Sequence, residues 1–201
     1  LRALGMDPAE HLAVANPISS DQGLLRRSLL PGILRNTAEN SKHFERFRLF
    51  EIGSEIHKKP EGLPDEIPHL AAVIYGHDDG LEGLMELKRV AEHLMPGCEL
   101  QHAEARPYEH PARAAEARWN GTRVGRLFEF HPSLVENGRA AVLYLDLTQL
   151  QRLAAQQQRR YTPLRRFPSS AFDLSVVAGL QEPVGNIQKL LRQFGGTDLI
   201  S

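Results

Sequence analysis

Residues 16–56, NPISSDQGLLRRSLLPGILRNTAENSKHFERFRLFEIGSEI, carry most of the information about how this chain folds. Apolar residues at helical spacing predict a helix over Leu24–Asn40, and Pro31 is expected to kink or split it. The alternation that follows predicts a strand over Phe47–His57. Beyond this stretch, strands grouped in hairpins with helices between them favour an α+β fold built on a mainly antiparallel sheet flanked by helices.

Two charged residues, Arg48 and Glu51, lie among the large apolar residues of the predicted strand. Because they are three positions apart, a regular strand directs them to opposite faces of its sheet. A charge buried without a partner is costly. The spacing therefore favours one charge facing solvent and one paired across the sheet, over a strand that presents both charges to a ligand in a cleft.

The rest of the chain continues the alternation of strands and helices. The Asn120-Gly121 pair predicts the tight turn of a hairpin. The expected elements are a turn-rich linker over 58–68, a buried strand over His69–Gly76, a helix over Gly80–Met95, hairpin strands over Ala114–Trp119 and Thr122–Phe130, a short helix over His131–Glu136, a strand over Ala141–Leu147, a helix over Thr148–Gln158, a strand over Phe172–Ala178 and a helix over Val184–Phe194.

Composition bounds the class of protein. The net charge of −1 argues against a surface that traps nucleic acid over its whole area, and leaves room for a local basic patch. One cysteine, Cys98, allows neither an intramolecular disulfide nor a thiolate-only metal cage. Without a signal peptide or an apolar run of about 20 residues, we expect a cytoplasmic protein with no membrane contact. The chain begins at Leu1, and both ends look cut, so we expect a piece of a longer polypeptide.

Motifs that would carry catalysis or metal binding do not stand out. His93, Cys98 and His102 lie close in sequence, but their spacing matches no familiar zinc pattern. No serine lies in a G-x-S-x-G context, and no glycine-rich loop for phosphate precedes a Lys-Ser or Lys-Thr pair. We therefore expect no catalytic residue and no metal site in this chain.

An arginine-rich segment, RRYTPLRRFP, follows the last of the expected central helices. Interleaved aromatic residues and arginines suit contacts with RNA bases and phosphates. A solvated linker between domains explains the same composition, and the sequence does not separate the two. Arg165 and Arg166 are the candidates for RNA binding.

Several motifs in a fixed order resemble a known family. They are NPIS at 16–19, LRRSLLPGIL at 25–34, RLFEIGSEI at 48–56 and HPARAAEARWNGTRVGRLFEFHP at 110–132. Together they resemble the beta subunit of bacterial phenylalanyl-tRNA synthetase, in the part folded like a class II synthetase catalytic core. The resemblance implies a catalytically inactive class II-like domain over 1–158, a linker over 159–171, and the truncated start of a ferredoxin-like anticodon-binding domain over 172–201.

The resemblance also implies roles for particular residues. LRRSLLPGIL resembles a degenerate dimer-interface motif, which makes Arg26, Arg27, Leu29, Leu30 and Pro31 candidates for contact with an alpha subunit. RLFEIG resembles the strand whose Arg-x-Glu grips ATP in active members. Here the spacing is Arg-x-x-Glu, and the glycine-rich third class II motif is not found, so a shared grip on one triphosphate is implausible.

The expected function is that of a non-catalytic domain within phenylalanine–tRNA ligase, an ATP-dependent heterotetramer. It would support assembly with the alpha subunit and presentation of tRNA(Phe), and the fragment alone would be inactive. ATP and magnesium would belong to the holoenzyme, with no cofactor in this chain. The alternatives are a synthetase paralogue that binds a small molecule or nucleotide in a synthetase-like cleft, and an independent RNA-binding module.

Overall fold

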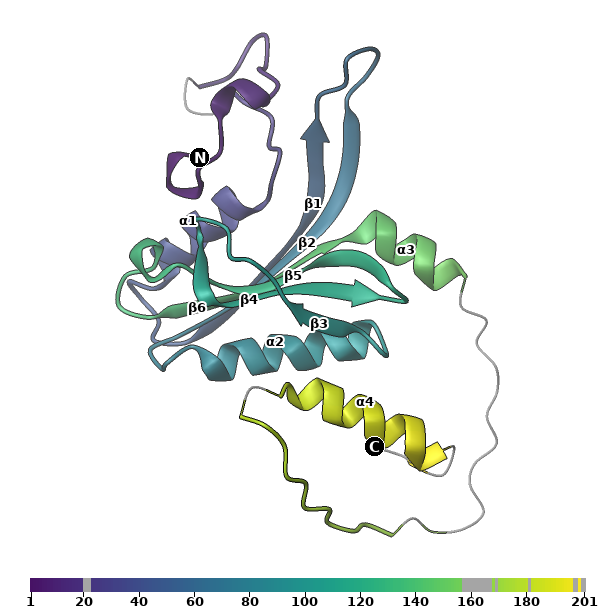
Figure 1. The fold of residues 1–201 in the computed structure, drawn as a ribbon. Coiled ribbons are helices and arrows are strands. Elements are labelled where there is room, and N and C mark those ends of the chain that lie inside the picture. Colours follow the sequence, from purple (N-terminus) through teal and green to yellow (C-terminus); the bar gives the residue numbers. More distant parts are fainter. Residues whose placement is uncertain (20–22, 157–167, 169, 181, 197–198, 200–201) are drawn as a thin grey trace. The chain divides into compact units, whose positions relative to one another are not determined.

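The computed structural model describes residues 1–201 apart from 20–22, 157–167, 169, 181, 197–198 and 200–201 (Figure 1). The chain divides into two compact units, Leu1–Arg159 and Arg160–Ser201. The first unit holds a six-stranded sheet with helices on both of its faces.

All neighbouring strands of the sheet are antiparallel, in the order β1-β2-β6-β5-β4-β3. The strands are β1 Phe47–His57, β2 Asp65–Gly76, β3 Glu99–His102, β4 Glu109–Trp119, β5 Thr122–Phe130 and β6 Arg139–Asp146. β1 forms one edge, and Figure 1 shows β1 and β2 running together as a long hairpin beyond the rest of the sheet. The predicted α+β class with a mainly antiparallel sheet is confirmed.

Helices cover the two faces of the sheet and create two cores. Alternate residues of β2 separate these cores: Val73 packs with α1 (Leu30–Asn40), and Ile74 packs with α2 (Leu81–Leu94). A third helix, α3 (Leu147–Ala155), contributes Leu153 to the core on the α2 side. Short 3-10 turns at η1 (Arg2–Leu4), η2 (Pro8–Glu10) and η4 (Pro132–Leu134) complete the unit.

The helix in the opening stretch is shorter than predicted. α1 begins at Leu30, so residues 24–29 lie outside it, and Leu24 instead forms an isolated β-bridge with Ala13. Pro31 lies in the first turn of α1, where no intrahelical partner is available for a backbone N–H. Proline therefore marks the start of this helix and does not kink it.

The hairpin predictions are confirmed, with changes at the ends of strands. Asn120 and Gly121 have φ angles of 49° and 75°, and Trp119 pairs with Thr122 across the turn. β2 begins at Asp65, inside the segment predicted to be a linker. Pro68 fits there because β6 pairs with β2 only from His69 onward, which leaves one side of β2 without a neighbour at the proline.

The second unit contains α4 (Val184–Gly195), as the apolar pattern predicted. The strand predicted over Phe172–Ala178 is wrong: these residues have no regular secondary structure. Phe172 and Val177 are highly exposed, and no described segment pairs with them, so the alternating pattern has no sheet to join. Most of the predicted 159–171 linker lies outside the described residues, and the domain assignments stay predictions.

Candidate functional site

The two charges of β1 lie on opposite faces of the sheet, as their spacing predicted. On the α2 face, the Arg48 guanidinium contacts the Glu86 carboxylate with N–O distances of 2.7 and 2.6 Å. On the α1 face, Glu51 accepts a hydrogen bond of 2.5 Å from Arg26. Each charge is therefore neutralised by a different element, and no single ligand can contact both through one face.

Arg26 lies flat against β1, where a glycine makes room for it. Its Nε donates to the backbone oxygen of Ser54 at 2.9 Å, while its Nη1 binds Glu51. The guanidinium occupies the space that a Cβ atom at Gly53 would fill. The first predicted interface residue thus connects the segment before α1 to the edge strand of its own sheet.

The other predicted interface residues divide between core and surface. Leu29 and Leu30 are each 1% exposed and belong to the hydrophobic core beneath α1. This burial corrects the interface prediction for these two residues, because buried side chains present no surface to a partner. Arg27 forms an ion pair with Glu10, and Pro31 is half-buried at the start of α1.

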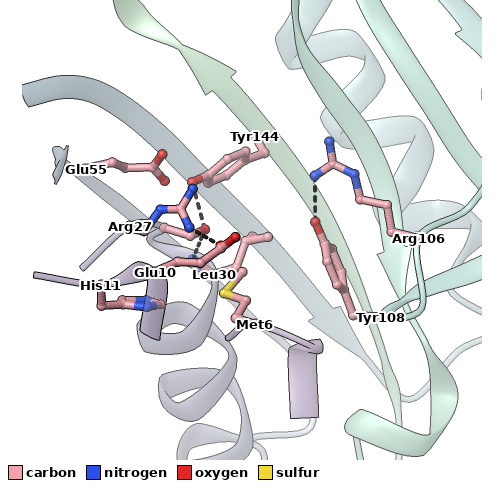
Figure 2. A pocket seen from close by; sticks show the side chains of 10 residues that line it. Met6, Glu10, His11, Arg27, Leu30, Glu55, Arg106, Tyr108 and Tyr144 are labelled. Carbon is pink, nitrogen blue, oxygen red and sulfur yellow. Dashed lines mark hydrogen bonds and ion pairs between the residues drawn. The ribbon is translucent and has the colours of Figure 1, made fainter. Parts of the chain in front are cut away.

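Beside this segment, the sheet face carries a cavity of about 260 Å³. Figure 2 shows Arg106 and Tyr108 on one side of it, with Arg27, Glu10 and Tyr144 grouped on the other. The residues that line the cavity come from the N-terminal turns, the segment before α1, β1, the loop before β4, and β6: Met6, Glu10, His11, Arg27, Ser28, Leu30, Glu55, Arg106, Tyr108 and Tyr144.

A buried carboxylate, Glu55, lies at the inner wall of this cavity with 4% of its surface exposed. It accepts the backbone N–H of Leu29 at 3.1 Å, and its other oxygen lies 3.3 Å from His57 and 3.4 Å from His69. Loss of hydration raises the pKa of Glu55, while the nearby His69 acts in the opposite direction. Glu55 therefore takes up a proton more readily than a solvated glutamate does.

Tyr144 joins these groups to α1. Its hydroxyl lies 3.0 Å from the Ser28 hydroxyl and accepts the Leu29 N–H at 3.3 Å. Its ring stacks on His69 with a centroid distance of 5.2 Å and an interplanar angle of 24°. The alternation of β6 alone could place Tyr144 on one face, but the sequence gives no signal that Ser28 lies opposite it.

A second cavity of about 330 Å³ adjoins the first and shares Arg106 and Tyr144 with it. Among its lining residues, Arg126 is 7% exposed and makes two hydrogen bonds, of 2.8 and 2.5 Å, to Glu109, which is 1% exposed. This buried pair connects β5 to β4. The sequence singles out neither residue, because the pairing of β4 with β5 shifts register between Glu109 and Ala114 and no local pattern predicts this shift.

Other sequence candidates do not converge on this face. His93 is hydrogen-bonded to the backbone oxygen of Arg89 at 2.7 Å, and burial raises the pKa of the Cys98 thiol to about 11. In the part of the chain that the structure describes, no three His, Cys, Asp or Glu residues are grouped in a way that could hold a metal ion. The RNA-binding candidates Arg165 and Arg166 lie outside the described residues.

The sheet with its helices has the fold of class II aminoacyl-tRNA synthetases. A pyrrolysyl-tRNA synthetase from Desulfitobacterium hafniense matches it with a TM-score of 0.57 over 74% of this chain and 55% of that chain, at 17% identity. A second structure of a pyrrolysyl-tRNA synthetase from the same organism matches with a TM-score of 0.54 over 67% of this chain and 51% of its own, at 18% identity. At these identities the likeness shows the fold alone.

The chain belongs to the family of the phenylalanyl-tRNA synthetase beta chain CLM domain, whose model matches residues 2–145. A phenylalanine–tRNA ligase beta subunit from Solibacter usitatus is 58% identical over 98% of this chain, and one from Bacillus licheniformis is 30% identical over 90%. The chain spans 26% and 24% of those two relatives, about a quarter of their length. The resemblance drawn from the motifs is confirmed.

Among the described residues, no helix is both long enough and apolar enough to cross a bilayer.

Proposed function

We propose that this chain is a non-catalytic domain of a phenylalanine–tRNA ligase beta subunit, and that it supports assembly with the alpha subunit. The observation that carries this proposal is the separation of Arg48 and Glu51. A grip on one triphosphate needs both side chains on one face, whereas here each is held by its own partner on a different face. The domain keeps the strand but not the arrangement that would contact ATP.

The surface we assign to the alpha subunit lies at the edge of the sheet. Phe50 and Ile52 project from β1 on the α2 face, and they are 74% and 60% exposed. Large apolar side chains at an unpaired sheet edge are typical of surfaces that a partner covers. Arg26, Arg27 and Pro31 stay candidates on the α1 face, although both arginines are occupied by intramolecular ion pairs.

We further propose that the holoenzyme supplies the remaining parts of the reaction. ATP and magnesium would bind outside this chain, and contacts with tRNA(Phe) would include the segment that carries Arg165 and Arg166. A cytoplasmic location follows from a role in translation. We expect this chain to contribute only a small part of the affinity for tRNA. Its net charge is −1, and sequence-independent binding to phosphates depends on positive charge.

Co-purification with an alpha subunit tests the assembly role. We expect the Phe50→Ser, Ile52→Thr double variant to recover about tenfold less alpha subunit than the unaltered chain, because both anchors of the apolar surface are removed. Leu63→Ser is the matched control: Leu63 is 86% exposed in the loop between β1 and β2, away from the proposed surface. Equal recovery with the double variant and the control would overturn the surface assignment.

A further inference from the structure

The two cavities on the α1 face are neighbours, because Arg106 and Tyr144 line both of them. We use the word trough for the space lined by these two residues together with Ser28, Glu55 and His69. Its walls come from the segment before α1, from β1, β2 and β6, and from the loop before β4. The larger cavity, of about 330 Å³, lies at the lower end of the sizes typical of small-molecule sites, and the smaller one measures about 260 Å³.

Most charges along the trough are already neutralised within the chain. Each of three arginines pairs with a carboxylate, and the aspartate at the far end caps α3. The pairs are Arg27 with Glu10, Arg123 with Glu116, Arg126 with Glu109, and Asp146 with the backbone N–H of Gln149. The ion pairs of the three arginines leave little free positive charge for a ligand, whereas a hydrogen bond from a backbone N–H does not neutralise the Asp146 carboxylate.

Arg106 is different. No ion pair joins its side chain to a carboxylate of the described residues. Its Nη1 donates to the Tyr108 hydroxyl at 2.7 Å, its guanidinium carbon lies 6.0 Å from the centre of that ring, and its backbone N–H donates to Glu109 at 3.0 Å. Tyr108 thus holds the Arg106 side chain through one hydrogen bond. The other N–H groups of the guanidinium can donate to a second acceptor.

The opposite wall of the trough is planar. His69 and Tyr144 stack on each other, and the Tyr144 hydroxyl is engaged with Ser28. The remaining carboxylate, Glu55, is buried, and the pKa of its side chain is raised by loss of hydration. A held cation facing a flat aromatic wall suits an oxyanion attached to a planar or apolar group.

We propose that the trough binds a small molecule through a carboxylate or phosphate group on Arg106, with the stacked rings of His69 and Tyr144 against the rest of the molecule. Tyr108 acts as the positioning residue for the guanidinium. A single arginine without a carboxylate partner favours a small molecule over an RNA backbone, which would need a run of exposed cations. This site goes beyond the proposed assembly role and needs no catalysis, so it stands or falls separately.

Chemical labelling of arginine with phenylglyoxal tests the site at a single residue. The native polypeptide that carries these residues, in its native assembly, is labelled and the modified arginines are located by mass spectrometry. The probes are inorganic phosphate for the phosphate source and benzoate for the carboxylate source, with chloride at equal ionic strength as the control. Arg46, whose partners are Glu82 and Glu86 of α2, is the internal reference.

We expect one probe to slow the labelling of Arg106 about fivefold or more in a saturable way, as a bound oxyanion covers the guanidinium. Arg46 should label at an unchanged rate. In Tyr108→Phe, the concentration for half protection should rise about threefold to tenfold, because Arg106 loses the hydrogen bond that positions it. Protection of Arg106 no greater than that given by chloride would overturn the proposal, and so would equal protection of Arg46.

Discussion

The guanidinium of Arg26 lies over Gly53, in the space that a side chain at that position would occupy. This contact brings the segment before α1 onto the edge strand and places Arg26 beside Glu51 and the backbone of Ser54. Because Glu51 is engaged in this way, the α1 face of β1 presents no free carboxylate at that position.

The contact makes Arg26 and Gly53 energetically dependent on each other. We expect Gly53→Ala to lower the free energy of unfolding by about 1–2 kcal/mol, since the new methyl group displaces Arg26 from its hydrogen bonds. In an Arg26→Ala background the same change should cost less, so the two effects should not add. Chemical denaturation of the four proteins measures the coupling, and strict additivity would contradict the contact.

The buried pair of Glu109 and Arg126 should matter more for stability than surface pairs do. We expect Glu109→Gln to lower the free energy of unfolding by about 3–5 kcal/mol, because it leaves the buried Arg126 charge uncompensated. Asp65→Asn is the matched control, since it removes one partner of the exposed Lys59–Asp65 pair and should change stability by less than about 1 kcal/mol. Similar losses in the two variants would show that the Glu109 pair is not isolated from solvent.

Glu55 should make stability depend on pH. Its folded-state pKa is raised by burial, so its stabilising contribution is full below the unfolded-state pKa and is lost as pH rises through the folded-state value. Glu55→Gln is neutral at every pH and keeps an acceptor for the Leu29 N–H. We therefore expect this variant to gain stability relative to the unaltered chain as pH rises from about 4 to 7.

Urea denaturation of both proteins across this pH range measures the difference. His57 and His69 face Glu55 directly, and both are kept in the variant. Parallel pH profiles for the two proteins would mean that Glu55 is not the source of the dependence.

The sequence predicted the sheet better than it predicted the site. Alternation over Phe47–His57 and the Asn-Gly turn are local signals, and both were sufficient. Pro31 was misread because a proline within a helical pattern and a proline in a first turn look alike without knowledge of where packing begins. Arg106, Glu55 and Tyr144 come from three distant segments, and their meeting depends on register and loop geometry that no local pattern encodes.

The separation of Arg48 and Glu51 was the one site feature that spacing alone predicted, because a strand has a period of two. Their partners, Glu86 and Arg26, could not be predicted in the same way. Those partners depend on how α2 and the segment before α1 pack on the two faces.

Phenylalanine-dependent exchange between ATP and pyrophosphate tests the non-catalytic role most directly. The chain purified without an alpha subunit is assayed beside a complete phenylalanine–tRNA ligase as positive control. The separation of Arg48 and Glu51 predicts no exchange above the rate without protein. Exchange that depends on phenylalanine and is carried out by this chain alone would contradict the account.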